Sequence, residues 1–520
     1  MPESTTIDQL VRSRATRYGD KPMVIDPTAR TGYGQLDAVT RDLAAVFVEA
    51  GVTKGTRVGL IMPNGARWVE VALALTRIGA VLVPLSTLLA AGELVAQLRA
   101  AAVQFLISVE EFRGRRYLDD LPPRTELPAL RQIWTADRLT DAIAGDRARR
   151  LVDAMTGAVT GADLMVIMFT SGSSGAPKGV MHSHGSALGA VRSGLAARRI
   201  TADTRLYLPM PFFWVGGFGS GILSTLLAGA TLVTEEIPRP ETTLRLLESE
   251  RVTLFRGWPD QAETLARHAA AIGADLSALR PGSLQALLPP DQRAQPGARA
   301  ALFGMTEAFG PYCGYPADTD MPAPAWGSCG KPFAGMEIRI VDADSGESVP
   351  AGRVGMIQIR GPHTLRGICG RSREDVFTVD GFYPTGDLGR LDEEGFLFYH
   401  GRSDDMFKVS GATVYPSEVE RALRTIEGVR SAFVTSVPGT TGAKVGAAVV
   451  CEGALSADHL SRCARTLLSA FKVPTVWLLL ESDDGVPRGG TGKVDTGRLR
   501  EMLIETGNQN VGRRGLPGCT

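Results

Sequence analysis

The chain has 520 residues, of which 44% are apolar and 22% charged, so it is too long for one small domain and too apolar for a disordered protein. Its 56 basic and 56 acidic side chains balance, which argues against nucleic-acid or anionic-membrane binding as the main role. The six cysteines form no C-x-x-C pair, so we expect reduced thiols. Without a membrane span or a signal-peptide pattern, the sequence predicts a cytoplasmic protein.

The first half of the chain alternates helical and strand patterns. Apolar residues recur at helical spacing before Gly51, at Leu36, Val39, Leu43, Val46 and Ala50. Apolar runs predict buried strands at 57–62, 81–86 and 104–109, with a second helix over 68–80. This alternation favours a largely parallel sheet covered by helices.

The pattern changes after about residue 325. Short strand-like runs at 337–342, 355–361 and 396–401 predict an antiparallel sheet or small barrel. Beyond residue 402, helical patterns at 417–426 and 456–470 flank strand patterns at 431–438 and 444–453. We therefore predict an α/β protein: a large domain over 1–402 with parallel-rich sheets and a β-barrel-like subdomain, a small α+β domain over 403–506, and a flexible tail over 507–520.

The segment TSGSSGAPKG, residues 170–179, follows an apolar strand pattern and ends with a lysine. Small residues allow backbone N–H groups to approach an anion, and Lys178 adds a positive charge, so this loop suits phosphate. It is not a Walker A loop, because Gly179 stands where that motif has Ser or Thr. A generic Gly/Ser-rich stretch is more often a surface loop, but this ten-residue string directly after a strand pattern favours phosphate binding.

Four further signatures follow in chain order. They are FGMTE (303–307), YPTGDLGRLDEEGF (383–396), GRSDDMFKVSGATVYPSEVE (401–420) and PRGGTGKVDTGRLR (487–500). Together with TSGSSGAPKG they resemble the adenylate-forming superfamily of acyl-CoA synthetases, peptide-synthetase adenylation domains and luciferases. The resemblance implies that a carboxylate attacks the α-phosphate of ATP, giving an acyl-adenylate and pyrophosphate, and that a thiol then displaces AMP.

The resemblance also implies roles for residues of the large domain. Thr306 would contact the α-phosphate, Glu307 would hold Mg²⁺, and Phe303 would stack on adenine in place of the family's usual tyrosine. Without the motif, Glu307 would be a common helix-start residue. The pyrophosphate-handling loop would comprise Thr170, Ser171, Gly172, Ser173, Ser174, Gly175 and Lys178.

The later signatures supply the remaining candidates. Asp387 would accept hydrogen bonds from both ribose hydroxyls, and Arg402 would bind ribose or phosphate oxygens. Lys493 matches the family's catalytic lysine, Asp404 the hinge between half-reactions, and Gly411 the glycine that lines the pantetheine channel. Outside these motifs, Arg402 and Lys493 would be ordinary solvated charges.

The segment around Trp214 and Gly216 borders the acyl pocket in the family, so we assign both to the substrate site. The neighbouring phenylalanines are typical of a core. Many acyl-CoA synthetases have histidine where this chain has Trp214. His182 and His184 stand two residues apart in a strand pattern and would face opposite sides, so they do not predict a metal pair.

The interval before FGMTE is the largest departure from the family. The segment 283–303 is short and contains no clear Gly-Ala-Pro turn of the kind that packs on adenine in the family. Part of the wall of the nucleotide pocket is therefore expected to be either missing or rebuilt. The resemblance implies an acyl-CoA synthetase that uses ATP, Mg²⁺ and coenzyme A on a fatty, aryl or alicyclic acid. Alternatives are an acyl-AMP ligase that loads a carrier protein and a non-catalytic binding homologue. A homodimer is possible.

Overall fold

The computed structural model describes residues 5–139, 143–170, 178–343, 345–403, 407–409, 412–439, 442–453, 455–468, 470–489 and 494–513. The described residues belong to two compact units. The larger comprises 1–338, 359–383 and 394–397, and the smaller comprises 339–358, 384–393 and 398–520. The chain thus passes between the units several times, and the predicted domain boundary after residue 402 stays a prediction.

A seven-stranded sheet forms one half of the larger unit, in the order β17-β8-β7-β4-β3-β5-β6. Its strands β7, β4, β3, β5 and β6 are parallel, as the strand–helix alternation predicted, whereas β8 and β17 run antiparallel to their neighbours. The strands are β3 (Arg57–Ile61), β4 (Val81–Pro84), β5 (Phe105–Ser108), β6 (Gln132–Thr135), β7 (Leu164–Thr170), β8 (Lys178–Ser183) and β17 (Gly367–Ile368).

A second sheet of five strands has the order β11-β9-β10-β1-β2. Its strands are β1 (Pro22–Ile25), β2 (Arg30–Gly32), β9 (Arg205–Tyr207), β10 (Thr231–Val233) and β11 (Leu254–Phe255). Strand β11 is an edge strand. The short interval 283–303 adds only two 3₁₀ turns, at Gln285–Leu287 and Pro290–Gln292, before the next strand.

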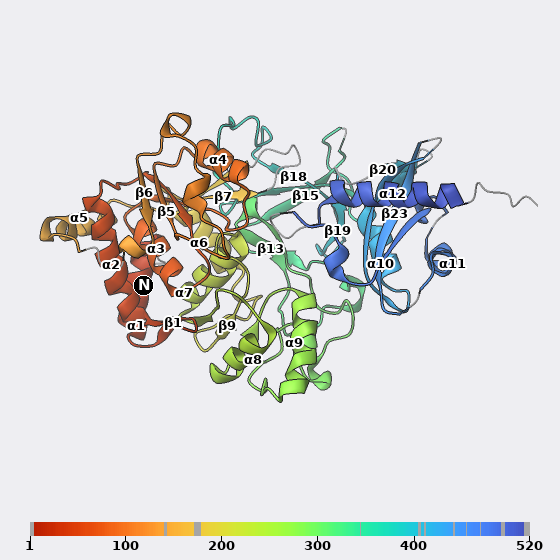
Figure 1. Ribbon diagram of the computed structural model, residues 1–520, viewed down its shortest axis with the longest axis horizontal. Coiled ribbons are helices and arrows are strands. Elements are labelled where there is room, and N and C mark those ends of the chain that lie inside the picture. Colours follow the sequence, from red (N-terminus) through yellow and green to blue (C-terminus); the bar gives the residue numbers. More distant parts are fainter. Residues whose placement is uncertain are drawn as a thin grey trace, which may run out of the picture. The chain divides into compact units, whose positions relative to one another are not determined.

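Helices pack on these sheets and on one another, and α1, α2, α3 and α5 gather on one side of the larger unit (Figure 1). Helix α3 is rich in Ala, Val and Leu and is buried over most of its length, so it forms the centre of the core. The helices are α1 (Ile7–Tyr18), α2 (Tyr33–Glu49), α3 (Ala66–Arg77), α4 (Ala91–Ala100), α5 (Asp146–Gly157), α6 (His184–Ser193), α7 (Ser224–Ala228), α8 (Pro240–Ser249) and α9 (Pro259–Ile272).

One buried ion-pair network holds the three N-terminal helices together. The fully buried Arg77 lies 2.6 Å from Asp8 of α1 and 2.9 Å from Asp37 of α2. Arg77 also donates a hydrogen bond to Thr40 Oγ1. A buried guanidinium is tolerated only with such partners, so this network specifies how the three helices pack.

The strands predicted at 337–342, 355–361 and 396–401 correspond to β15, β16 and β19 of a four-stranded sheet with the order β15-β16-β18-β19. A separate three-stranded sheet has the order β12-β13-β14. Their bounds are β12 (Phe303–Met305), β13 (Gly310–Gly314), β14 (Lys331–Pro332), β15 (Glu337–Val341), β16 (Gly355–Arg360), β18 (Tyr383–Leu391) and β19 (Leu397–Arg402). Cys313, Cys329, Cys369, Cys451 and Cys463 form no disulfide.

The C-terminal part has the predicted α+β composition. Strands β22 and β23 are antiparallel, and β24 runs parallel to β23. The elements are β20 (Phe407–Val409), β21 (Ala412–Val414), α10 (Pro416–Leu423), β22 (Val429–Gly439), β23 (Gly442–Cys451), α11 (Ala457–Leu467), β24 (Val476–Leu480) and α12 (Thr496–Arg513). None of the helices in the described part of the chain has the length and apolar character needed to cross a bilayer.

Helix α12 reaches into the segment that the sequence predicted as a flexible tail over 507–520. The boundary and flexibility of that tail stay predictions. Leu499 and Leu503 of this helix are buried against Val437 and Ala448, so an apolar stripe fixes the first turns and the helix continues from them. Residues 514–520 lie outside the described residues.

Candidate active site

A tight turn carries Thr306 and Glu307 between β12 and β13. Phe309 has φ +55°, a left-handed conformation that is uncommon for a large side chain. A Cβ at Gly304 would lie 2.2 Å from the carbonyl oxygen of Gly310, so only glycine lets the two strands close on each other. The close approach of the two backbones therefore explains why the FGMTE motif has glycine at position 304.

Three contacts hold this turn. His182 Nε2 donates to the carbonyl oxygen of Thr306 at 2.7 Å, and the backbone N–H of Leu365 donates to that of Glu307 at 2.8 Å. The hydroxyl of Tyr383 donates to Glu307 Oε1 at 3.0 Å. Glu307 is only 6% exposed, so its carboxylate is fixed in position rather than free in solvent. The contacts of His182 and Tyr383 with this turn could not be predicted from the sequence, because they span 124 and 76 residues.

Burial keeps His182 neutral. Desolvation lowers the pKa of His182 to about 4, and its ring packs edge-on against Phe309 with 4.9 Å between ring centroids. His184 is also buried, with its pKa lowered to about 4, and its Nδ1 accepts from the backbone N–H of Ile7. His182 thus supports the Thr306 turn, whereas His184 contacts the start of helix α1. Within the described ranges, no group of three or more His, Cys, Asp or Glu side chains forms a metal cage.

The candidate phosphate loop connects two adjacent antiparallel strands. Thr170, the last residue of β7, is paired in register with Lys178, the first residue of β8. The two ends of the loop therefore lie side by side in the sheet. Ser171, Gly172, Ser173, Ser174 and Gly175 lie outside the described residues. Strand β8 also carries His182, so Lys178 and the histidine that donates to the Thr306 carbonyl belong to one strand.

Asp387 and Arg402 lie together in the smaller unit. Arg402 Nη1 is 3.5 Å from Asp387 Oδ1 and donates to the carbonyl oxygen of Thr385 at 3.1 Å. Gly386, at φ +74°, allows this approach, because a Cβ there would lie 2.9 Å from the guanidinium. Asp387 is 7% exposed. The motif therefore builds a carboxylate–guanidinium pair on β18 and β19. Asp404, Gly411 and Lys493 lie outside the described residues.

Aromatic residues surround the candidate acyl segment. Trp214 is half-buried, and its ring packs edge-on against Trp258, with 6.3 Å between centroids. Phe212 and Phe218 pack on the fully buried Trp68, which confirms that they are core residues. The sequence did not single out Trp258, since its partner lies 44 positions earlier in a different loop.

The glycine-rich run after Trp214 forms a π-helix, Gly216–Leu223. A Cβ at Gly216 would lie 2.7 Å from the sulfur of Met210, and one at Gly217 would lie 2.1 Å from the carbonyl oxygen of Pro211. These glycines allow the helix to start directly against the preceding segment. Asn64 fixes that segment, because its side chain donates to the Met210 carbonyl and accepts from the Phe212 N–H.

Phe303 is half-buried, and its ring packs edge-on against Tyr312 with 5.5 Å between centroids. Tyr312 belongs to β13, the strand that pairs with β12. This contact holds the ring that the sequence predicted to stack on adenine.

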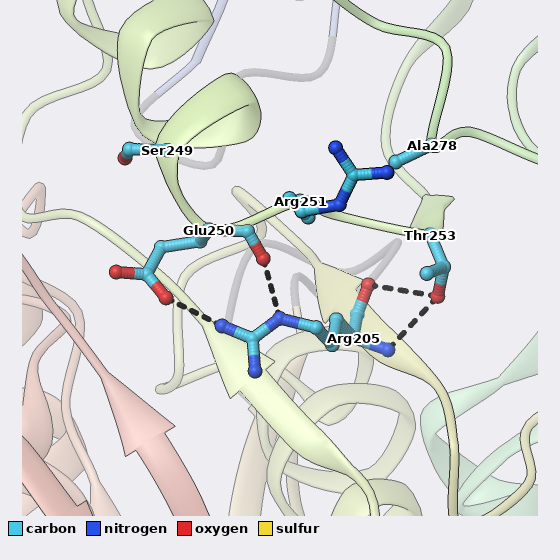
Figure 2. Close-up of a pocket in the computed structure, with 6 residues that line it drawn as sticks. All are labelled: Arg205, Ser249, Glu250, Arg251, Thr253 and Ala278. Atoms are coloured by element: carbon cyan, nitrogen blue, oxygen red, sulfur yellow. Dashed lines mark hydrogen bonds and ion pairs between the residues drawn. The ribbon is translucent and has the colours of Figure 1, made fainter.

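A separate pocket of about 500 Å³ lies at the amino ends of strands β9 and β11 (Figure 2). Arg205 begins β9 and Thr253 precedes β11, whereas Trp214 and Trp258 follow the carboxyl ends of these parallel strands. Arg205 is paired with Glu250, whose other carboxylate oxygen is paired with Arg30. The pocket therefore belongs to a surface ion-pair cluster rather than to the candidate site.

Known proteins are similar to this chain over most of its length. Residues 11–369 match the family described as AMP-binding enzyme. A methyl-dioxo-octahydroindenyl-propanoyl:CoA ligase of Mycobacterium tuberculosis is 32% identical over 95% of this chain and 98% of that ligase. A feruloyl-CoA synthase of an Amycolatopsis species is 32% identical over 91% of this chain and 94% of that enzyme.

Solved structures show the same fold. A fatty acyl CoA synthetase of Mycobacterium tuberculosis superposes with a TM-score of 0.73 at 25% identity, covering 96% of this chain and 99% of that one. An anthranilate CoA ligase in complex with anthranoyl-AMP gives a TM-score of 0.80 at 22% identity, covering 98% and 99%. The chain belongs to the AMP-binding enzymes of the adenylate-forming superfamily, and it is an acid–thiol ligase of the acyl-CoA synthetase type.

Proposed function

We propose that the protein activates a ring-bearing carboxylic acid with ATP and transfers the acyl group to coenzyme A, releasing AMP and pyrophosphate. The observation that carries this proposal is the Thr306–Glu307 turn, held by His182, Leu365 and Tyr383. A turn fixed from three directions presents its hydroxyl and carboxylate without a reorganisation cost during the reaction, which is what stabilisation of developing charge requires.

The first half-reaction brings two anions together. The acid's carboxylate and the α-phosphate repel each other, so cationic groups must offset their charge. We assign this role to Lys178 at the end of the phosphate loop and to Lys493. The Thr306 hydroxyl would donate to an α-phosphate oxygen.

The residues present fit Mg²⁺ as a cofactor. Glu307 offers a fixed, buried carboxylate, and Mg²⁺ commonly binds one or two carboxylates together with substrate phosphates rather than an all-protein cage. When bound there, Mg²⁺ would neutralise phosphate charge. Tyr383 would keep Glu307 oriented toward it by occupying one oxygen.

Nucleotide and thiol contacts complete the assignment. Asp387 would accept hydrogen bonds from the ribose hydroxyls, and Arg402 would orient that carboxylate while donating to the Thr385 carbonyl nearby. Phe303 would stack on adenine, and the phosphate loop over 170–178 would hold pyrophosphate. Gly411 would line the path of the pantetheine arm, and Asp404 would be the hinge.

The choice of a ring-bearing acid rests on the aromatic lining. Trp214 and Trp258 present flat apolar faces beside the candidate acyl segment, and aromatic faces pack well on rings. The two relatives at 32% identity are named for bicyclic and aryl acids, which supports this choice.

A panel of acids tests the proposal. We expect ATP- and CoA-dependent formation of acyl-CoA, detected by mass spectrometry, to be faster with aryl and alicyclic propanoates than with octanoate. Faster reaction with octanoate would contradict the ring preference. Acyl-AMP that accumulates and never reaches CoA would favour a carrier-protein acceptor. No pyrophosphate release with any acid would favour a non-catalytic binding protein.

A further inference from the structure

Two arginines in the larger unit bury their guanidinium groups without an anionic partner. Arg198 is 4% exposed and Arg256 is half-buried. Arg198 Nε and Nη2 donate to the carbonyl oxygens of Gly194 and Val191, at 3.2 and 3.0 Å. Arg256 Nη2 donates to the carbonyl oxygen of Arg198 at 3.1 Å. In the described part of the chain, neither arginine has a carboxylate partner.

Donor groups on both side chains remain unused. Arg198 Nη1 and Arg256 Nε are buried and have no hydrogen-bond acceptor among the described residues. The carbonyls at the end of α6 attract Arg198 through the helix dipole, which supplies only a partial charge. Backbone carbonyls thus fix the direction of both guanidinium groups but leave two positive charges uncompensated.

The two charges also repel each other. Burial lowers the pKa of Arg198 to about 9, with a further contribution from the charge of Arg256, and burial lowers that of Arg256 to about 10. An unpaired buried charge destabilises a fold, and Arg77 shows how this chain otherwise pairs such a group, with Asp8 and Asp37. A water molecule would accept hydrogen bonds but would supply no charge. Both buried donors can be satisfied by an oxygen acceptor, and an anionic acceptor compensates the two charges most.

Arg256 lies close to the candidate acyl segment. Its backbone N–H donates to the carbonyl oxygen of Tyr207 at the end of β9, the strand that leads to Trp214. At Gly257, a Cβ would lie 3.1 Å from Pro209. Two residues after Arg256, the ring of Trp258 meets that of Trp214. The segment 256–258 thus runs beside 207–214 along its length.

We propose that Arg198 and Arg256 form a subsite that binds an oxygen acceptor at the far end of the acid substrate, remote from the carboxylate that is activated. This inference rests on the proposed function. A second carboxylate would satisfy both the free donors and the charge, and a ring ketone would satisfy the donors alone. The enzyme would therefore select acids that carry such a group over purely hydrocarbon acids of equal size.

Three cyclohexane-propanoic acids that differ only at ring position 4 test this subsite: one carries a methyl group, one a ketone and one a carboxylate. We expect kcat/KM in the order carboxylate, ketone, methyl. Arg256→Met should lower kcat/KM about 10- to 100-fold for the carboxylate acid, less for the ketone, and little for the methyl acid. Arg256→Lys should recover part of the carboxylate preference, because it keeps the charge.

A neighbouring arginine supplies the control. Arg199→Met removes an exposed guanidinium that is paired with Asp318, and it should leave the order of the three acids unchanged. Melting temperature separates a binding role from a structural one. The ligand-free Arg256→Met variant should melt at or above the wild-type temperature, because it loses an unpaired buried charge.

Two results would overturn the subsite. One is an equal loss of kcat/KM with all three acids in Arg256→Met. The other is a wild-type enzyme whose kcat/KM is the same for all three acids. Turnover of any of the acids would still support the proposed ligase. If none is turned over, equilibrium binding of the same acids, followed by tryptophan fluorescence, decides the subsite separately. A carboxylate preference that Arg256→Met abolishes supports it, and equal affinities overturn it.

Discussion

At the scale of single residues, Glu307 combines burial with a fixed orientation. Its carbonyl oxygen is bonded to the Leu365 N–H and one of its carboxylate oxygens to Tyr383. A carboxylate kept in place in this way can meet a hard cation without first losing conformational freedom, which is the advantage of a preorganised site.

Replacing Glu307 tests that role. Glu307→Gln should lower turnover by roughly 10- to 100-fold and raise the Mg²⁺ concentration needed for half-maximal rate, because an amide supplies no anionic ligand. Tyr383→Phe is the matched control: it keeps the charge and removes one hydrogen bond, at a cost of about 1 kcal/mol. Pyrophosphate release measured across a Mg²⁺ titration gives both values. A Glu307→Gln enzyme with an unchanged Mg²⁺ requirement would remove this residue from the metal site.

The buried histidines make stability depend on pH. His182 and His184 keep pKa values of about 4 in the fold, whereas unfolding returns each to about 6.5. Between these values the unfolded chain binds more protons, so stability falls as pH falls from 6.5 toward 4. From pH 6.5 to 5 we expect a loss of about 1.6 kcal/mol per histidine in the free energy of unfolding.

Denaturant unfolding at pH 5, 6 and 7 measures this loss. His184→Gln removes one titrating group without touching the Thr306 turn, so the decline should be about half that of the wild type. An equally steep decline in His184→Gln would show that other groups cause it.

At this scale the sequence could nominate candidate residues that lie in local motifs, but it could not predict contacts between distant segments. The motifs singled out Thr306, Glu307, Asp387 and Arg402, and the structure brings Arg402 against Asp387. The contacts of His182 with Thr306 and of Arg256 with Arg198 join different elements, and no periodicity or spacing in the sequence encodes them.

At the scale of elements, the π-helix Gly216–Leu223 depends on glycines where other helices avoid them. Gly217→Ala would place a methyl group within 2.1 Å of the Pro211 carbonyl oxygen, so the helix start and Trp214 must move. We expect a lower melting temperature and a loss of ligase activity that exceeds the loss of folded protein, measured by mass spectrometry and circular dichroism. Strain of this kind typically costs about 1–3 kcal/mol.

Gly92 in α4 is the control, because a Cβ there meets nothing within 4 Å. Gly92→Ala should stabilise the protein by about 0.5–1 kcal/mol through its helix propensity and should leave activity unchanged. Unaltered activity and stability in Gly217→Ala would show that the π-helix accommodates a side chain.

Long periodic elements were the easiest to predict. The helix expected over 36–50 corresponds to α2, and the runs at 57–62, 81–86 and 104–109 contain β3, β4 and β5, because their apolar residues are buried in clusters on both faces of the sheet. Strands of two or three residues, such as β11 and β12, are too short to show a period. The end of α12 is hard to predict from the sequence because its Gly and Asn residues disfavour a helix, whereas its earlier leucines are buried and stabilise one.

At the scale of the whole molecule, the proposed residues fall on both compact units. Lys178, Thr306 and Glu307 belong to the larger unit, and Asp387, Arg402 and the segment around Lys493 belong to the smaller. The two half-reactions make different demands, since adenylation needs cations at the phosphate and thioester formation needs a path for the pantetheine thiol. A protein built from two units can meet these demands in turn if Asp404 acts as the predicted hinge.

Lys493→Ala separates the half-reactions. We expect carboxylate-dependent pyrophosphate exchange to fall roughly 100- to 1000-fold, because the lysine acts on charge that develops in the transition state, while ATP affinity changes little. Thioester formation from preformed acyl-AMP and CoA should continue at nearly the wild-type rate, since that step no longer joins two anions. Lys444→Ala removes an exposed lysine of the same unit and should affect neither step. Equal loss of both half-reactions in Lys493→Ala would place the lysine in general nucleotide binding, and wild-type exchange would remove it from catalysis.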